Sequence, residues 1–365
     1  MTVLRRHPAL RWLVPLVAAL ALVLGGSAIG VLTATARGGL PDRSAAQLLV
    51  DVQKARLDGL SGTIVQNAEL GLPSLPGVGG SGSSEMSSLV AGSHTLRLWY
   101  AGPDRVRLAL QGSLGESDVI RRGPDLWTWS SASKKATHRR VPVAGADIPG
   151  SLAEASPLTP QDAAEAALKA ISPTTRVSTD GTAVVAGRSA YELLLRPRTS
   201  GSLVTSVRIA IDGETHVPTR VQIFGKDLGK PAFEVGFTAV DFTRPDASMF
   251  RFNPPPGTEV TTRSEAPKKP SRSGSQHAHG VGPEPTVVGT GWTTVVVAKV
   301  PAGAPRGSDR GSLRSALKVL PEVSGSWGSG HLLRGTIFSA VLTDDGRVAV
   351  GAVAPERLYA ALARS

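Results

Sequence analysis

Alternation of apolar and polar residues dominates the chain from about residue 60 to residue 250. In "HTLRLWYAGPDRVRLAL" (His94–Leu110) two alternating runs flank a Gly-Pro-Asp turn, and "LVTSVRIAIDGETHVPTRVQIFG" (Leu203–Gly225) repeats the scheme. A period of two residues predicts strands with one covered face, and short turns predict antiparallel hairpins. We therefore expect one large antiparallel sheet.

Helical periodicity is rare in this part of the chain. Apolar residues recur at helical spacing in Asp42–Leu57, and Thr159–Ile171 begins with a threonine N-cap followed by proline at the first position. Two helices are available to cover a large sheet. A sheet that curls around them leaves an interior volume, which is either filled by the helices or left as an apolar cavity open at one side.

Composition divides the chain into four segments. We expect an N-terminal signal or membrane anchor in 1–41, the sheet domain in 42–258, a disordered Pro/Ser/Lys-rich linker in 259–290 and a small α+β domain in 291–365. The last domain is predicted to contain strands in 291–300, 335–345 and 347–355, and helices in 309–323 and 356–363.

The stretch Gly71–Ser93 is rich in Gly, Ser and Pro but also carries several apolar residues, among them Leu72, Leu89 and Val90. A purely polar linker would not need them. The segment is either a loose hairpin tip or a flap that covers an apolar opening.

The N-terminus carries the clearest targeting signal. Arg5, Arg6 and Arg11 precede an uncharged run from residue 12 to residue 36, long enough to cross a bilayer of roughly 30 Å as a helix. The basic residues keep their side cytoplasmic, so the rest of the chain is expected outside the cytoplasm. "ATA" at residues 34–36 fits a cleavage site, so secretion is the alternative to the retained anchor that we favour.

Charge and cysteine content exclude several classes. There is no cysteine among the 365 residues, which rules out disulfides, thiol catalysis and thiolate metal sites. The net charge is +11, and without the four arginines that flank the N-terminal segment 36 basic residues stand against 29 acidic ones, an excess of +7. That excess suits contact with an anionic membrane surface or polymer, or is a solvated basic surface. No nucleic-acid-binding module is recognisable, so no nucleic-acid partner is expected.

No set of residues assembles into a catalytic centre. The chain lacks a nucleophile elbow, a zinc-protease helix, a phosphate loop and a dinucleotide fingerprint. Asp180, Asp212, Asp344 and Asp345 stand beside glycines or turns, where turn formation explains them. The only clustered histidines, His277 and His279, lie in the linker. We therefore expect no enzyme, no metal and no cofactor.

An apolar interior suits a hydrophobic ligand, because such ligands need apolar walls and few polar anchors. The candidate wall residues alternate along the hairpin strands, although for each one a plain core role is the alternative. On the first hairpin they are Leu96, Leu98, Tyr100, Val106, Leu108 and Leu110. On the later hairpin they are Val207, Ile209, Ile211, Val221 and Ile223.

Several fragments in order carry a resemblance to a known family. "DLWTWSSASKKATH", "VAGRSAYELLLRP", "DGETHVPTRVQIFG", "FTAVDF" and "ASMFRFNPPPGTEV", over about residues 42–260, resemble the LolA/LolB lipoprotein-carrier superfamily, especially its actinobacterial members. The C-terminal module is similar, more weakly, to the small domain of RseB/MucB, periplasmic regulators of an anti-sigma factor. The resemblance implies a mainly β (α+β) fold, a half-open antiparallel β-barrel lidded by helices, which binds acyl chains.

Two functions follow from the resemblance. The first is tethered, non-enzymatic binding of lipid acyl chains or lipoproteins. A shuttle to an outer membrane does not fit an anchored chain. The second is an RseB-like regulator of envelope stress that holds a membrane partner, which the C-terminal module favours.

The pair Trp127 and Trp129 is the last candidate. The two indoles share one face of a short strand, and Leu126 and Thr128 share the other. They either line the cavity or brace the outer face of the sheet. We favour the inward orientation, which adds both to the candidate wall.

Overall fold

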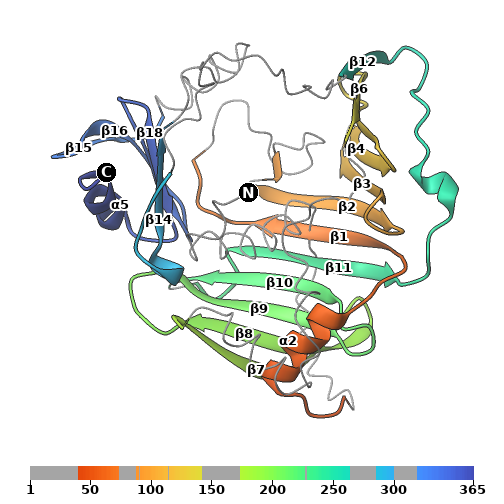
Figure 1. The fold of residues 1–365 in the computed structure, drawn as a ribbon, viewed down its shortest axis with the longest axis horizontal. Helices are drawn as coiled ribbons and strands as arrows, with labels where there is room; N and C mark the ends of the chain where they lie inside the picture. Colours follow the sequence, from red (N-terminus) through yellow and green to blue (C-terminus); the bar gives the residue numbers. More distant parts are fainter. Residues whose placement is uncertain are drawn as a thin grey trace, which may run out of the picture.

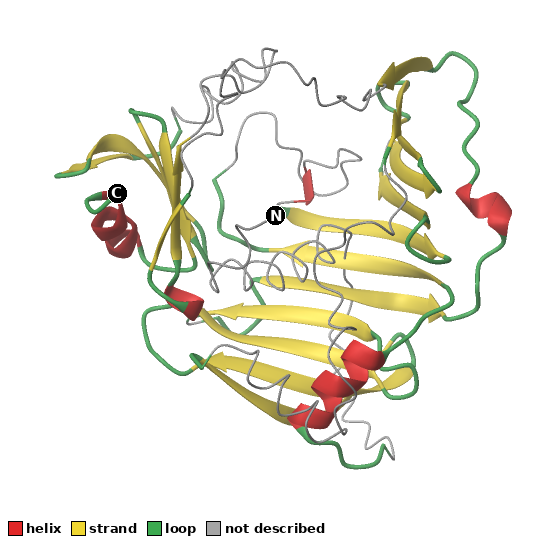
Figure 2. Cartoon of the chain, in the orientation of Figure 1, coloured by secondary structure: helices red, strands yellow, loops and turns green. Residues whose placement is uncertain are grey.

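The computed structural model describes residues 40–73, 88–89, 91–113, 115–141, 173–226, 228–263, 285–299 and 319–365. In this part of the chain the predicted alternation forms a 12-stranded sheet and a separate 6-stranded sheet (Figures 1 and 2). The predictions for the N-terminal anchor, the helix Thr159–Ile171, His277 and His279 lie outside the described residues. So do those for most of the flap and for most of the helix in 309–323.

The large sheet is mainly antiparallel and open. Its strand order is β12-β6-β5-β4-β3-β2-β1-β11-β10-β9-β8-β7, so β12 and β7 stand at its two ends and the sheet does not close into a barrel. The half-open fold is thereby confirmed. Its strands are β1 (Leu60–Ala68), β2 (Gly92–Tyr100), β3 (Arg105–Gly112), β4 (Gly115–Arg122), β5 (Asp125–Ser130), β6 (Lys135–Arg140), β7 (Thr175–Val185), β8 (Arg188–Pro197), β9 (Val204–Asp212), β10 (Pro218–Gly225), β11 (Phe233–Asp241) and β12 (Glu259–Arg263).

The helix predicted in Asp42–Leu57 is confirmed as α2 (Ala45–Lys54). Ser44 accepts a hydrogen bond from the Gln47 N–H, and the Gln47 side chain accepts one from the Ser44 N–H, which forms a capping box. Leu48 is fully buried against Tyr191 and Ile211 of the sheet. We call the face that α2 covers the inner face and the opposite one the outer face.

The polar linker is shorter than its composition predicts. Glu259–Arg263 forms β12, which pairs in parallel with β6, and Thr286–Val288 forms β13 of the small sheet. Both were assigned to the linker 259–290, and this is corrected. The β-branched residues in "EVTTR" and "TVV" favour strands, and free edges of β6 and β14 supply main-chain partners.

The small sheet has the order β13-β14-β18-β17-β16-β15. The helix α5 (Pro355–Leu362) packs Leu358 and Leu362 against it, as predicted for 356–363. The end of the helix predicted in 309–323 is wrong, because Glu322 and Val323 pair with β16 instead. Its other elements are η4 (Gly291–Thr293), β14 (Val295–Lys299), β15 (Glu322–Gly325), β16 (Gly328–Arg334), β17 (Ser339–Thr343) and β18 (Arg347–Gly351).

Candidate functional site

The predicted residues of the two hairpins all lie on the inner face. Cross-strand partners share one face of a sheet. Leu98 packs against the cluster that contains Val221 and Ile223, and Ile211 belongs to the cluster formed with Leu48 of α2. The two hairpins therefore contribute to one apolar surface. The cross-strand pairs are Leu96–Leu110, Leu98–Leu108 and Tyr100–Val106 in β2–β3, and Val207–Ile223 and Ile209–Val221 in β9–β10.

Burial divides these residues into two groups. The fully or nearly fully buried group is Leu96, Leu110, Val207, Ile211, Val221 and Ile223. The partly exposed group is Leu98, Tyr100, Val106, Leu108 and Ile209. The first group acts as core in the described structure, and the second offers apolar surface that a ligand could cover.

Leu89 covers one part of the inner face. It is 4% exposed and packs against Leu96 and Leu110. The described part of the predicted flap thus has a packed apolar residue. The rest of that segment lies outside the described residues.

Two polar residues on the inner face hold this segment, and the sequence analysis missed both. The Gln66 side-chain amide donates to the carbonyl of Leu89, and the Nε2 of His94 lies 2.9 Å from the carbonyl of Ala91. Gln66 and His94 are 1% and 3% exposed. A signal was present, because each occupies an inward position of an otherwise apolar alternation in β1 or β2.

The small domain closes another part of the same face. Trp292, Ile337 and Ala352 pack against the apolar cluster that contains Val207 and Ile223. Figure 1 shows this domain beside the ends of β9 and β10. The inner face is therefore bounded by elements from both domains.

Hydrogen bonds fix this contact between the domains. The N–H of Thr336 donates to the carbonyl of Leu70 at 2.7 Å, and the N–H of Leu203 donates to the carbonyl of Ala352 at 2.8 Å. The Trp292 indole N–H donates to Oγ1 of Thr175 at 2.8 Å. Main-chain bonds of this kind hold the backbones in one register.

The tryptophan pair faces outward, so the predicted inward orientation is wrong. Trp127 pairs with Ile120 and stacks on His138, with ring centroids 4.4 Å apart. Phe252, in the segment between β11 and β12, packs against both indoles. Since Leu126 pairs with Arg121, on the face of Val106, Trp127 and Trp129 lie on the opposite face from the apolar wall.

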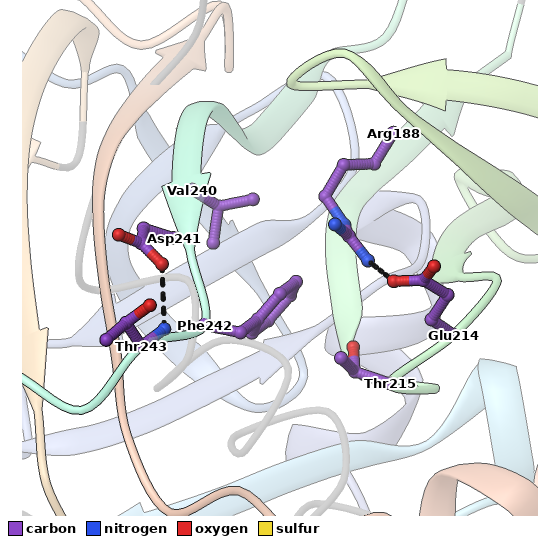
Figure 3. A pocket seen from close by; sticks show the side chains of 7 residues that line it. All are labelled: Arg188, Glu214, Thr215, Val240, Asp241, Phe242 and Thr243. Carbon is purple, nitrogen blue, oxygen red and sulfur yellow. Dashed lines mark hydrogen bonds and ion pairs between the residues drawn. The ribbon is translucent and has the colours of Figure 1, made fainter.

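The described pockets do not coincide with the apolar wall. One, of about 320 Å³, lies between Arg188, Glu214 and Phe242 at the turn-side ends of β8–β11 (Figure 3). The other, of about 490 Å³, is on the outer face and is lined by Gln111, Glu116 and Trp129, among others.

The charged side chains that line the first pocket form ion pairs. Arg188 contacts Asp212 and Glu214 at 2.5 and 2.6 Å and lies over the Phe242 ring. Burial acts to raise the pKa of Asp212, but hydrogen bonds from Arg188 and Thr215 outweigh it and hold that pKa below its usual range. The Asp212 carboxylate also accepts the main-chain N–H groups of Glu214 and Thr215, so it fixes the β9–β10 turn.

Within the described ranges no three His, Asp or Glu residues gather as metal ligands. Across those ranges no helix is long and apolar enough to span a bilayer.

Together these features define a class of protein: an open antiparallel sheet with an apolar inner face, joined to a small α+β domain that closes part of that face. No protein-family model matches the chain, and no curated protein matches it.

Solved structures do match. MucB of Pseudomonas aeruginosa, in complex with MucA, is 16% identical with a TM-score of 0.42, over 87% of this chain and 96% of that one. The lipoprotein LppX of Mycobacterium tuberculosis is 13% identical with a TM-score of 0.26, over 52% of this chain and 92% of that one. A LolA superfamily protein of Nitrosomonas europaea is 8% identical with a TM-score of 0.22, over 58% and 99%.

These structures include MucB and a LolA superfamily protein, which belong to the groups that the sequence resembles. At such identities and scores the likeness is one of fold.

Proposed function

We propose that this protein binds lipid acyl chains or lipoproteins outside the cytoplasm, without catalysis, against its inner face while tethered at the membrane by its N-terminal segment. The observation that carries the proposal is the partly exposed apolar group, Leu98, Tyr100, Val106, Leu108 and Ile209, on the same face as a buried core. Each methylene buried against such a surface contributes about 0.8 kcal/mol.

A chain-length series tests this directly. Monoacylglycerols of increasing chain length displace a fluorescent fatty acid from the full chain, and the dissociation constant should fall about fourfold per methylene. Mass spectrometry of the purified protein should also identify a co-purifying amphiphile. An affinity independent of chain length, together with no co-purifying amphiphile, would refute the proposal.

A pair of variants on one strand locates the site. Leu98→Asn places an amide in the apolar face and should weaken acyl binding about tenfold, because an amide is buried without partners. Arg97→Asn changes the neighbouring residue, which faces the other way, and should leave binding within twofold. Equal thermal midpoints show that Leu98→Asn has not simply unfolded the protein.

A second candidate function is regulatory, with the two domains together holding a membrane protein. It is favoured by the docking of the small domain on the apolar cluster, where Ile337 and Ala352 contact the large sheet. MucB has been solved in complex with MucA, and we propose a partner of comparable kind here.

The two functions differ in their response to undocking. Deleting the small domain would uncover the cluster of Ala68, Val204 and Phe233, so a point variant is the cleaner test. If the protein is a carrier, Ile337→Ser should leave its acyl binding unchanged. If it is a regulator, the same variant should abolish its crosslinking to a membrane protein in its native cells. If the variant retains both its acyl binding and its crosslink to the membrane protein, the regulatory function is excluded.

A further inference from the structure

The small sheet carries apolar residues on both of its faces. In its central strands β14, β17 and β18, residues 295–298, 340–342 and 348–350 are apolar throughout, with no alternation of apolar and polar positions. Continuous runs of this kind are typical of strands that are covered on both sides, because the solvated face of an antiparallel sheet carries polar residues. The pattern indicates that each face of this sheet has a covering partner.

The helix α5 covers one face only. Val297, Ala349 and Val341 are cross-strand neighbours in one row, and they belong to the apolar cluster that includes Leu358 and Leu362 of α5. We call the opposite side of the small sheet the free face. By register, its first row is Val287, Val296, Val350, Ala340 and Leu333, and its second row is Ala298, Val348 and Leu342.

The residues of the free face are all at least partly exposed. Val350 is 39% exposed. None of them belongs to an apolar cluster formed by the described part of the chain. Polar side chains enter the second row only at its β15 edge, where His331 and Glu322 end it. A contiguous apolar surface with polar groups only at its rim is the usual mark of a binding site.

The free face meets the inner face of the large sheet at a corner. Val353 belongs to the α5 cluster, whereas its neighbour Ala352, on the side of Val350, packs against the cluster of Val207 and Ile223. In Figure 1, α5 lies on the side of the small sheet that is turned away from the large sheet. The free face therefore continues the apolar surface of the inner face into the small domain.

We infer that the free face binds a second acyl chain, so that this protein takes two-chain amphiphiles. One chain lies against Leu98 and Leu108 of the inner face, and the other lies against Val350 and its neighbours. The inference rests on the proposed function and specifies its ligand class.

An acyl chain suits the free face better than a peptide does. The strands β14, β17 and β18 each have a partner strand on both sides, so their main-chain groups bond within the sheet. A peptide laid over them would bury its own N–H and C=O groups without partners, whereas a hydrocarbon chain has no such groups.

Two valines supply a matched pair of variants. Val350 is 39% exposed on the free face, and Val260 of β12 is 46% exposed. Val260 pairs with Ala136, in the row of Trp129 on the outer face of the large sheet. Val350→Asn and Val260→Asn therefore make the same change at similar exposure, and only the first places an amide in the free face. Equal thermal midpoints of the two variants show that neither has unfolded the protein.

The experiment measures binding of monooctanoyl and dioctanoyl phosphatidylcholine, below their micelle concentrations, to the full chain in a non-ionic amphipol. The two lipids share a headgroup and differ in the number of chains. The dioctanoyl lipid should bind about tenfold more tightly or better, because its second chain is also buried. Val350→Asn should abolish that preference and leave binding of the monooctanoyl lipid unchanged, and Val260→Asn should retain the preference.

Photolabelling gives a readout that needs no variant. A dioctanoyl lipid with a diazirine at the end of each chain should label both the β2–β3 hairpin and the strands of the free face, as located by mass spectrometry of the peptides. Labels confined to the large sheet would overturn the inference.

Each other outcome also overturns the inference, in a distinguishable way. Equal binding of the one-chain and two-chain lipids removes the second site and leaves acyl binding intact, whereas binding of neither lipid refutes the proposed function itself. An equal loss of preference in both variants means an effect that is not specific to the free face. A dimer that Val350→Asn converts into monomers means that a second copy of the chain covers this face. Loss of a crosslink to a membrane protein in native cells, with the lipid preference intact, means that a protein partner covers it.

Discussion

The contact between Trp292 and Thr175 gives a quantitative test of how the two domains dock. The indole N–H donates to Thr175 Oγ1 at 2.8 Å, Thr175 is 7% exposed, and the indole ring packs against the apolar cluster of the large sheet. Trp292→Phe keeps an aromatic ring and removes the donor, and Thr175→Val keeps the shape and removes the acceptor.

The hydrogen bond alone is worth about 1 kcal/mol net, and leaving its buried partner unsatisfied adds to the loss, so each single variant should lose about 1–3 kcal/mol. The double variant should lose less than the sum of the two, with a coupling energy of about 1 kcal/mol, because no partner is then left unsatisfied.

The assay is urea unfolding of the full chain and the three variants, followed both by circular dichroism and by tryptophan emission. Trp292→Ala serves as a positive control, with an expected loss of about 3–5 kcal/mol from the missing ring. Strict additivity of the two single variants would refute the docking geometry, since residues without contact do not couple.

Three further predictions concern the sheet. Burial of Asp118 raises its pKa, because it outweighs the effect of the neighbouring arginine. The carboxyl therefore contributes less stability as the pH rises above 3.8 through its folded pKa. Asp118→Asn should gain stability relative to wild type over that window, as measured by urea titrations at several pH values. The pKa of Asp212 is lowered, so its ion pair with Arg188 stabilises the fold above pH 3.8 and loses its effect as pH falls through the folded pKa. Asp212→Asn should accordingly cost on the order of 2 kcal/mol at neutral pH and progressively less in acid; a constant cost across pH would contradict this. Trp127→Ala should lower the thermal midpoint by several degrees, because it removes a stacked aromatic, but should change acyl binding less than twofold; a large loss of binding would return the indoles to the ligand site.

Much of the fold could be predicted from the sequence because strand alternation is local. The hairpins at His94–Leu110 and Leu203–Gly225 form as β2–β3 and β9–β10, and the inward residues on each are the ones that alternate as apolar. The capped helix at residues 45–54 was recognisable for the same reason. Each depends on neighbours within a few positions along the chain.

The sequence predictions failed where the structure of a segment depends on residues that are distant along the chain. Glu259–Arg263 has a polar composition, and only the free edge of β6 makes it a strand. Gln66 and His94 interrupt apolar faces, and their purpose appears only once the carbonyls of Leu89 and Ala91 lie above them. No spacing along the chain joins these residues, which are brought together by the sheet.

The orientation of Trp127 and Trp129 shows how such a choice is made. A single strand with tryptophans on one face and Leu126 and Thr128 on the other favours turning the tryptophans inward, because indoles bury more apolar area. Yet a shift of one residue in β5 alone would break its register with β4, and a shift of the whole wall would turn Leu96 and Leu110 outward.

Those leucines are fully buried, and exposing the pair would cost about 3–6 kcal/mol at 1.5–3 kcal/mol for each side chain. The tryptophans avoid a comparable loss, because Phe252 and His138 cover them on the outer face. The same register places Arg121 and Arg139 on the inner face and Arg122 and Arg140 on the outer face. The side of the sheet that carries the indoles is therefore fixed by the burial of the leucines of β2 and β3.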